Sequence, residues 1–332
     1  MRKEVLAVGC ALMVFCGCGK NNAAQHYESG WAAMEKKDYT TAVNEFQQVI
    51  DQNSRLAESY RAEGIAYYSE KAYPEAIAAF SRSLNNMDDP DKEFKKDVQF
   101  YLAQARMDYG EVDKAIEVYS EILKAGEDEQ AFFLRGKAYI SMEDYKNAEK
   151  DFQRALEGCE DYNLYINIYQ IYVDHNKAVD GDAYLKMALE LEPQDGEDCY
   201  HRGRIYEYEK NYEAARDELK TAMEQGYEDA MLLLGRVYLE MEDPASARSM
   251  YQEYLQKSEQ GAKAYNGLAM CDIYDGAYDS ALENIAQGLK ENSKEDEQGL
   301  LYNEIVAYEY KRDFATAKEK MKIYLEQYPE DE

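Results

Sequence analysis

The side chains that most often carry out chemistry in proteins are few and widely separated in this 332-residue sequence. Its three histidines, His26, His175 and His201, form neither a His-Glu-x-x-His motif nor another spacing that would pair two metal ligands. Neither a Walker A phosphate loop nor a Gly-x-Ser-x-Gly nucleophile turn occurs. The acidic stretch 174–182 only loosely suggests a calcium loop, because its glycine and closing glutamate are misplaced, and we favour a turn. We therefore predict no catalytic residue, no metal site and no cofactor.

The composition narrows the range of partners. Asp and Glu total 67 against 38 Lys and Arg, which gives a formal net charge of −29. Nucleic-acid binding depends on basic side chains that neutralise phosphates, so we predict no nucleic-acid partner. The 32 tyrosines argue against a disordered acidic chain, because such chains are poor in aromatic residues. Only five prolines occur, which suits helices better than a sandwich or a barrel.

The N-terminus has the pattern of an export signal. Arg2 and Lys3 precede an apolar run over residues 5–16, which is too short to cross a bilayer as a helix. The run closes on Gly17 and Cys18 before a polar stretch, and this resembles a bacterial lipobox, whose cysteine is lipidated and begins the mature protein. We predict a signal peptide over 1–17, lipidation of Cys18, a short tether over 18–22, and anchoring to a bacterial membrane on its extracytoplasmic side. The alternative is a plain signal peptide cut near Cys18.

The rest of the sequence repeats a pattern of a small residue, two aromatic residues, an alanine and a bulky residue. Its clearest copy is Gly64, Tyr67, Tyr73, Ala76 and Phe80. The first position of the pattern recurs at 30, 64, 103, 136, 169, 203, 235, 269 and 305, so successive copies lie 32 to 39 residues apart. Over residues 23–331 the chain resembles the tetratricopeptide repeat family, whose period is 34 residues. The resemblance implies an all-α, right-handed superhelical solenoid of about nine helix-turn-helix repeats.

The repeated residues have clear physical roles in such a helix pair. Small residues and alanines allow two antiparallel helices to approach closely, and offsets of three and four place them on one helix face. Polar residues just before the second helices can cap them: Asp38, Asp144, Asn211, Asp243 and Asp313. The aromatic positions assign most tyrosines to helix packing rather than to ligand stacking. Of the three remaining cysteines, Cys159, Cys199 and Cys271, we expect Cys199 in the core and no disulfide framework.

Three segments depart from the pattern. Residues 85–97 and 290–298 carry extra residues between copies, and we expect longer surface turns there. The fifth copy, residues 162–195, has Asp180-Gly181-Asp182 near the place of the alanine. We expect this copy to form a longer loop or to kink the superhelix.

The family resemblance also suggests where a partner would bind. In tetratricopeptide repeats the first helices line a concave groove, and residues at the second, fifth, ninth and twelfth places of each repeat usually touch the partner. The fifth places here are Tyr27, Arg61, Phe100, Phe133, Ile166, Tyr200, Leu232, Asn266 and Tyr302. The ninth places are Trp31, Ile65, Gln104, Lys137, Gln170, Arg204, Arg236, Met270 and Val306.

Seven of these residues are the predicted contacts. Tyr27 and Trp31 would form an aromatic patch, and Phe100 and Phe133 an apolar stretch. Arg204 and Arg236 would put two positive charges on adjacent repeats and could hold a carboxylate through paired hydrogen bonds, and Tyr200 is a further candidate contact. Trp31 could instead cap the first repeat, and the two arginines could pair with Glu207 and Glu240 one turn later on their own helices.

The predicted function follows from the anchor and the groove together. We expect a membrane-anchored extracytoplasmic scaffold that is not an enzyme and that holds a protein or peptide partner in its concave groove. The alternatives are a lipoprotein that binds a glycan, peptidoglycan or a peptide, and a lipoprotein that helps to assemble the cell envelope.

Overall fold

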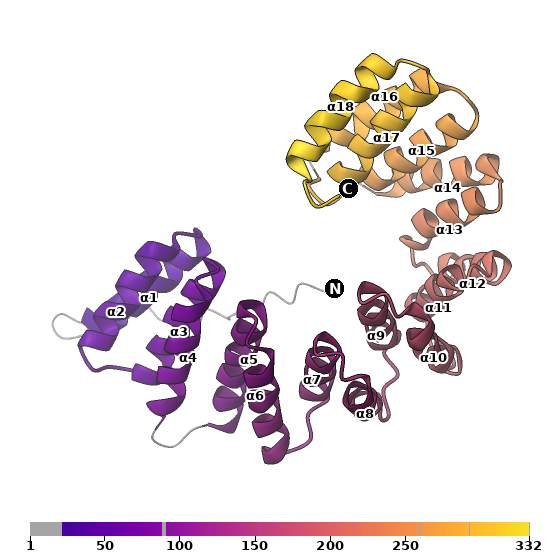
Figure 1. Ribbon diagram of the computed structural model, residues 1–332. Coiled ribbons are helices and arrows are strands. Elements are labelled where there is room, and N and C mark those ends of the chain that lie inside the picture. The colour runs from indigo at the N-terminus through magenta and orange to yellow at the C-terminus, as the bar shows by residue number, and fades with distance from the viewer. Residues whose placement is uncertain (1–21, 88–90, 259, 292, 332) are drawn as a thin grey trace. The chain divides into compact units, whose positions relative to one another are not determined.

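The computed structural model describes residues 22–87, 91–258, 260–291 and 293–331, and this part of the chain contains eighteen α-helices and no strand. They form nine consecutive pairs that divide into two compact units, the first ending at Glu157 and the second beginning at Gly158 (Figure 1). The first unit holds α1 (Asn22–Glu35), α2 (Tyr39–Asp51), α3 (Leu56–Ser69), α4 (Tyr73–Asn85), α5 (Lys92–Tyr109), α6 (Val112–Ala125), α7 (Glu129–Ser141) and α8 (Tyr145–Ala155). The second holds α9 (Tyr162–Asp174), α10 (Ala178–Leu189), α11 (Gly196–Tyr208), α12 (Tyr212–Glu224), α13 (Ala230–Glu240), α14 (Pro244–Lys257), α15 (Ala262–Tyr274), α16 (Tyr278–Lys290), α17 (Glu297–Tyr310) and α18 (Phe314–Gln327).

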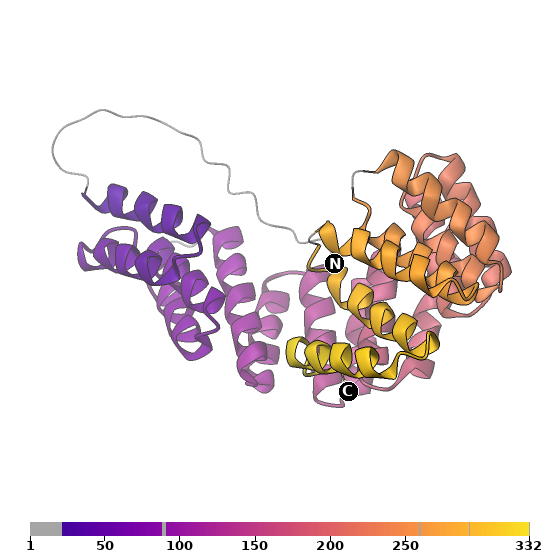
Figure 2. The same ribbon diagram turned by 90° about the horizontal axis from the view of Figure 1, so that it is seen from above.

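Each unit is a stack of helix pairs in chain order. The two helices of a pair pack on each other, and the second helix packs on the first helix of the next pair. Figure 2 shows this order in the second unit, where the helices follow one another from magenta to yellow. The all-α solenoid of about nine repeats is therefore confirmed.

The turn inside each pair has the same design. Its middle residue is left-handed in all nine described turns, and only Gly110 and Gly276 of these are glycine. The next residue caps the second helix in five repeats: the side chains of Asp38, Asp144, Asn211, Asp243 and Asp313 each accept a hydrogen bond from the backbone N–H three residues later. All five predicted caps are confirmed, because a short oxygen-bearing side chain satisfies an otherwise unpaired donor of the first helical turn.

The glycine that opens the repeat pattern allows the two helices of a pair to approach closely. A Cβ atom built on Gly64 would lie 2.6 Å from Cε1 of Phe80, and one built on Gly136 would lie 2.7 Å from Cε1 of Phe152. Both rings are fully buried. The glycine of the first helix therefore leaves the space that the bulky residue of the second helix fills.

Two predicted longer loops are not formed as expected, whereas a kink of the superhelix at the fifth repeat stays a prediction. The fifth repeat forms a regular pair, α9 and α10, joined by a short turn over residues 175–177. Gly181 replaces the expected alanine, and its missing Cβ leaves room for Tyr172 and Tyr169 of α9. The extra residues after α4 mostly lengthen α5, which begins at Lys92, so a surface turn through residue 97 is not formed. The predicted connector over 290–298 is confirmed between α16 and α17.

Burial agrees with the expected roles of cysteine and tyrosine. Cys199 is buried, as predicted. Of the 32 tyrosines only five are exposed, and the remaining ones are buried or half-buried. The exposed ones are Tyr109, Tyr208, Tyr274, Tyr302 and Tyr310.

The predicted signal peptide and Cys18 lie outside the described residues. None of the helices in the described part of the chain is both long enough and apolar enough to span a membrane.

Candidate binding pocket of the second unit

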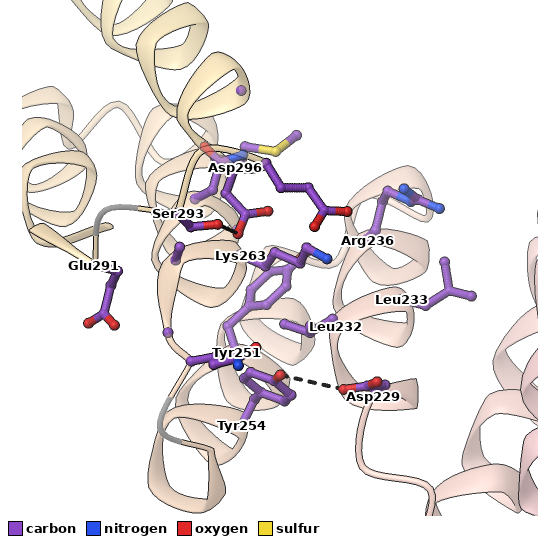
Figure 3. Close-up of a pocket in the computed structure, with 18 of the residues that line it drawn as sticks. Asp229, Leu232, Leu233, Arg236, Tyr251, Tyr254, Lys263, Glu291, Ser293 and Asp296 are labelled. Carbon is purple, nitrogen blue, oxygen red and sulfur yellow. Dashed lines mark hydrogen bonds between the residues drawn. The ribbon is translucent and has the colours of Figure 1, made fainter. Parts of the chain in front are cut away.

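The first helices of neighbouring pairs in the second unit touch one another directly, from α9 to α11 and onward to α17. A pocket of about 730 Å³ opens on this face (Figure 3). Residues from α11, α13, α14, α15 and α17 and from the connectors before α13, α15 and α17 line it. They are Tyr200, Asp229, Leu232, Leu233, Arg236, Tyr251, Tyr254, Gln260, Gly261, Ala262, Lys263, Asn266, Gly267, Met270, Glu291, Ser293, Glu295, Asp296 and Gly299.

The floor of the pocket is a tyrosine ring held between two glycines. A Cβ atom on Gly235 of α13 would lie 2.6 Å from the Tyr251 ring, and one on Gly267 of α15 would lie 2.3 Å from it. The ring is 4% exposed, and burial raises the pKa of the phenol, which therefore stays neutral. Beside it Tyr254 donates a hydrogen bond of 3.4 Å to Asp229, drawn as a dashed line in Figure 3.

The wall formed by α15 and α17 is polar. The side-chain amide of Asn303 donates to Oδ1 of Asn266 at 2.8 Å, which holds the Asn266 amide at the pocket. Above it, the hydroxyl of Ser293 donates to Asp296 at 2.6 Å (Figure 3). This hydrogen bond joins Ser293 of the connector to Asp296, the residue just before α17. It therefore fixes the position of an acidic side chain at the rim of the pocket.

The charges of three basic side chains act on the phenol of Tyr200 at the α11 end of the pocket. The guanidinium of Arg204 lies 5.9 Å from the centre of the Tyr200 ring. The centre of the Tyr227 ring lies 4.9 Å from the same point. Burial raises the pKa of Tyr200, and the charge of Arg204 opposes this rise. The negative charge of Asp229 adds to the rise, whereas Arg236 and Lys263 also oppose it. One cation from each of α11, α13 and α15 therefore acts on the same phenol.

Arg236 makes an ion pair with the preceding repeat. Its Nε lies 2.6 Å from Oε1 of Glu207, and its second terminal nitrogen donates to Oε2 at 2.7 Å. The expected pairing along one helix is therefore wrong for Arg236, because neighbouring first helices are close enough for the side chain to reach Glu207 of α11. Glu240 instead accepts a hydrogen bond of 3.2 Å from Tyr212.

Arg204 contacts a buried imidazole rather than Glu207. One of its terminal nitrogens lies 3.2 Å from Nδ1 of His201, and the side-chain nitrogen of Asn163 lies 3.1 Å from Nε2 of the same ring. Burial, and then the charge of Arg204, lower the pKa of His201. The imidazole is therefore neutral near pH 7 and leaves the positive charge of Arg204 uncompensated by this contact.

The four predicted contact residues of the first unit pack on their own repeats. Rings of Tyr27 and Trp31 lie 5.8 and 5.6 Å from that of Phe46, Phe100 lies 6.3 Å from Tyr119, and Phe133 lies 6.2 Å from Phe152. All four are half-buried. This packing agrees with the alternative that Trp31 caps the first repeat, and contact with a partner at these four residues stays a prediction.

The pocket brings together two predicted contact residues, Tyr200 and Arg236, and places Arg204 against Tyr200. Sequence reasoning did not single out Lys263, Asn266 or the connector 291–296. Asn266 and Met270 occupy fifth and ninth places of the eighth repeat, so the register already contained a signal for them. The residue types of the connector gave no signal of a binding site, because its position beside α15 depends on tertiary packing.

The chemistry of the pocket suits binding. In the described part of the chain no group of three His, Cys, Asp or Glu residues is arranged to hold a metal ion. The pocket offers amide, carboxylate and cationic groups around apolar side chains such as Leu232 and Met270. A site with an apolar floor and a few fixed polar groups is the usual form of a ligand site in proteins.

Comparison with known proteins agrees with this architecture. Two family models described as tetratricopeptide repeat match the chain, one over residues 27–91, 200–262 and 232–296, and the other over 129–161. Together the matches cover more than half of the sequence. No curated protein matches the chain in sequence.

Among solved structures, yeast Tom70 is 16% identical, with a TM-score of 0.53 over 90% of this chain and 67% of that one. A tetratricopeptide repeat protein from Parabacteroides merdae is also 16% identical, with a TM-score of 0.47 over 86% of this chain and 99% of that one. YrrB, described as a TPR protein with an unusual peptide-binding site, is 26% identical over 54% of this chain and 93% of its own, with a TM-score of 0.35. By its nine registered helix pairs and these family matches, the chain belongs to the tetratricopeptide repeat family, whose fold suggests a scaffold for protein–protein interaction.

Proposed function

We propose that the chain is a membrane-anchored, extracytoplasmic scaffold that binds a peptide segment of a partner protein in the pocket of the second unit. One observation carries the proposal: the pocket is lined by fifth- and ninth-place residues of three successive repeats. These residues are Tyr200, Leu232, Arg236, Asn266 and Met270. One comes from α11 and two each from α13 and α15, so an extended segment that crosses these helices would meet new side chains at each repeat.

The pocket has the groups that an extended peptide requires. The amide of Asn266 can exchange hydrogen bonds with a peptide backbone, which has one donor and one acceptor per residue. Leu232 and Met270 provide an apolar surface for one or two side chains. The volume of about 730 Å³ lies within the usual range of ligand sites, roughly 300–1,000 Å³.

Two methionines provide a matched test of this site. Met270 is 40% exposed in the pocket, whereas Met142 is 45% exposed at the end of α7 in the first unit. Crosslinking in cells followed by mass spectrometry should recover the same partner with the wild-type chain and with Met142→Arg, and should lose it with Met270→Arg. Equal recovery by the two arginine variants would place the partner elsewhere and contradict the proposal.

The proposed anchor is tested separately through the cysteines at the N-terminus. Cys18→Ser should move the protein from the membrane fraction to the soluble fraction and abolish metabolic labelling by a radioactive fatty acid. Cys16→Ser is the control and should leave both properties unchanged. Membrane association and labelling that survive Cys18→Ser would rule out lipidation at this residue and leave the plain signal peptide as the better interpretation.

The glycan alternative has less support. It requires ring faces open to a sugar, and the half-buried rings of Tyr27, Trp31, Phe100 and Phe133 lie against other aromatic rings of their own repeats. Titration of the chain with peptidoglycan fragments, followed through the fluorescence of the single tryptophan, should leave the emission of Trp31 unchanged.

A further inference from the structure

We propose that the pocket of the second unit selects a peptide segment that carries both charges. An acidic side chain would be held near Tyr200 by Arg204 and Lys263, and a basic side chain by Glu291, Glu295 and Asp296 of the connector between α16 and α17. The inference rests on the proposed peptide-binding function and adds the chemistry of the partner. Its basis is the distribution of charge around the pocket: Arg204 and Lys263 act on Tyr200, whereas Glu291, Glu295 and Asp296 lie in the connector. Asp229 also acts on Tyr200, and it already accepts a hydrogen bond from Tyr254.

The cationic side lies at the α11 end. Arg204 lies against Tyr200 and next to the neutral His201, and Lys263 lines the same pocket as Tyr200. Lys263 is exposed, and none of the ion pairs among the described residues includes it. Arg236 contributes less, because it already forms an ion pair with Glu207 and donates a hydrogen bond to it. The donors for a ligand carboxylate are therefore Arg204 and Lys263, rather than the pair Arg204 and Arg236 expected from the sequence.

The anionic side is the connector between α16 and α17. Glu291, Glu295 and Asp296 line the pocket there, and the bond from Ser293 holds Asp296 in place. No ion pair in the described part of the chain involves Glu291 or Glu295. In Figure 3, Arg236 on α13 and Glu291 in the connector lie on opposite sides of the pocket, with Lys263 between them. Arg204 on α11 and Lys263 on α15 belong to other elements than Glu291 and Glu295 in the connector, so the two charges of a ligand would be met on different elements.

The charge of the whole chain argues against a ligand with acidic groups alone. A net charge of −29 repels an acidic peptide at long range, and the connector would repel it again inside the pocket. A purely basic peptide would be attracted at long range but would meet Arg204 and Lys263 at the α11 end. A segment with one acidic and one basic side chain is attracted by the cations near Tyr200 and by the carboxylates of the connector. A peptide with charges of only one sign is repelled by one of these two groups, and this repulsion discriminates against it.

Selection from a phage-displayed library of random dodecapeptides on the immobilised whole chain tests the inference. We expect enriched sequences to contain Asp or Glu at a fixed separation from Lys or Arg. The best peptide, labelled with fluorescein, should bind Lys263→Glu roughly tenfold more weakly by fluorescence polarisation. Lys318→Glu, an exposed change of the same charge on α18 outside the pocket, should bind as the wild type does. Replacing the acidic residue of the peptide with Lys should restore binding to Lys263→Glu.

The outcomes separate the inference from the function on which it rests. If the acidic residue of the selected peptide can be changed to Gln without loss, while Met270→Arg still abolishes binding, the charge inference is wrong and the pocket remains a peptide site. If no peptide is enriched on the wild-type chain relative to Met270→Arg, the peptide-binding function itself is wrong.

Discussion

Glu63 stands immediately before the first-position glycine of its repeat, where two other repeats have an arginine. Arg135 and Arg202 occupy this place in the fourth and sixth repeats, and they pair with Asp151 and Glu218 of their second helices. The corresponding partner place in the second repeat is Ala79, by the same register. Glu63 is 3% exposed and its Oε2 has no hydrogen-bond partner, so a buried acid is left where other repeats have a pair.

We expect Glu63→Gln to stabilise the protein at neutral pH. Burial raises the pKa of Glu63 above 4.5, and the charge of Arg82 only partly opposes this. The folded state therefore penalises the ionised form, and the penalty is complete above the folded pKa and disappears below the unfolded value of 4.5. Urea unfolding at pH 7 should show Gln more stable than Glu, with a smaller difference at pH 4. A lower stability of the Gln variant at pH 7 would mean that the attraction to Arg82 outweighs burial.

In the fourth repeat the removal of one charge should have the opposite effect and destabilise the protein, because Arg135 and Asp151 form an ion pair. Nε and a terminal nitrogen of Arg135 donate to the two carboxylate oxygens of Asp151 at 2.7 and 2.8 Å, and Asp151 is 5% exposed. Arg135→Met would leave a buried carboxylate without its partner, which costs about 3–5 kcal/mol of unfolding free energy. The double variant Arg135→Met, Asp151→Leu should recover most of this loss in urea titrations. A double variant as unstable as the single one would show that the pair itself, rather than the stranded charge, supports the fold.

At the scale of the helix pair, the glycine of the first helix decides how closely the second helix can approach. Gly64→Val should lower the unfolding free energy by about 1–3 kcal/mol or more, because Cβ would overlap the fully buried Phe80 ring. Gly126→Val in the same unit is the control: its backbone is extended and no atom lies within 4 Å of a Cβ at that position. Its effect should stay within about 0.5 kcal/mol. Similar losses for both variants, measured by thermal and urea unfolding, would show that the close approach at Gly64 is not limiting.

The regular parts of these helix pairs could be predicted from sequence because their causes are local. The caps Asp38 and Asp144 require only a short oxygen-bearing side chain beside the start of a helix. The fifth repeat was misjudged because Gly181 performs the same packing role as alanine, which the pattern did not include. The extra residues before α5 could equally extend a helix or a loop, and the choice depends on packing along the chain.

The candidate site was less predictable, because it depends on how neighbouring repeats pack rather than on local residue types. Tyr200 and Arg236 follow from the repeat register, since a fixed place on a first helix faces the same way in every repeat. The pairing of Arg236 with Glu207 depends on how far apart α11 and α13 lie, and the acidic connector 291–296 on where α17 begins. Neither the separation of the two helices nor the first residue of α17 is determined by local residue types.

For the whole molecule, the excess of negative charge sets the dependence of stability on salt. The chain carries −29, and charges of one sign repel one another more strongly when the chain is compact. Raising NaCl from about 20 to 300 mM shortens the screening length from roughly 20 Å to below 10 Å, so the melting temperature should rise. Circular dichroism melts in NaCl and KCl should give the same trend. A falling melting temperature would show that ion pairs such as Arg202 with Glu218 outweigh the repulsion.

The tyrosine ring beneath the pocket belongs to two repeats at once. Tyr251 fills the space left by Gly235 in its own repeat and by Gly267 in the next one, so neither first helix can leave without exposing the same ring. In a linear array whose stability is a sum of repeat terms and neighbour terms, such a shared side chain strengthens one neighbour term. The seventh and eighth repeats should therefore open together in hydrogen exchange, and a ligand seated above Tyr251 would slow the exchange of both α13 and α15.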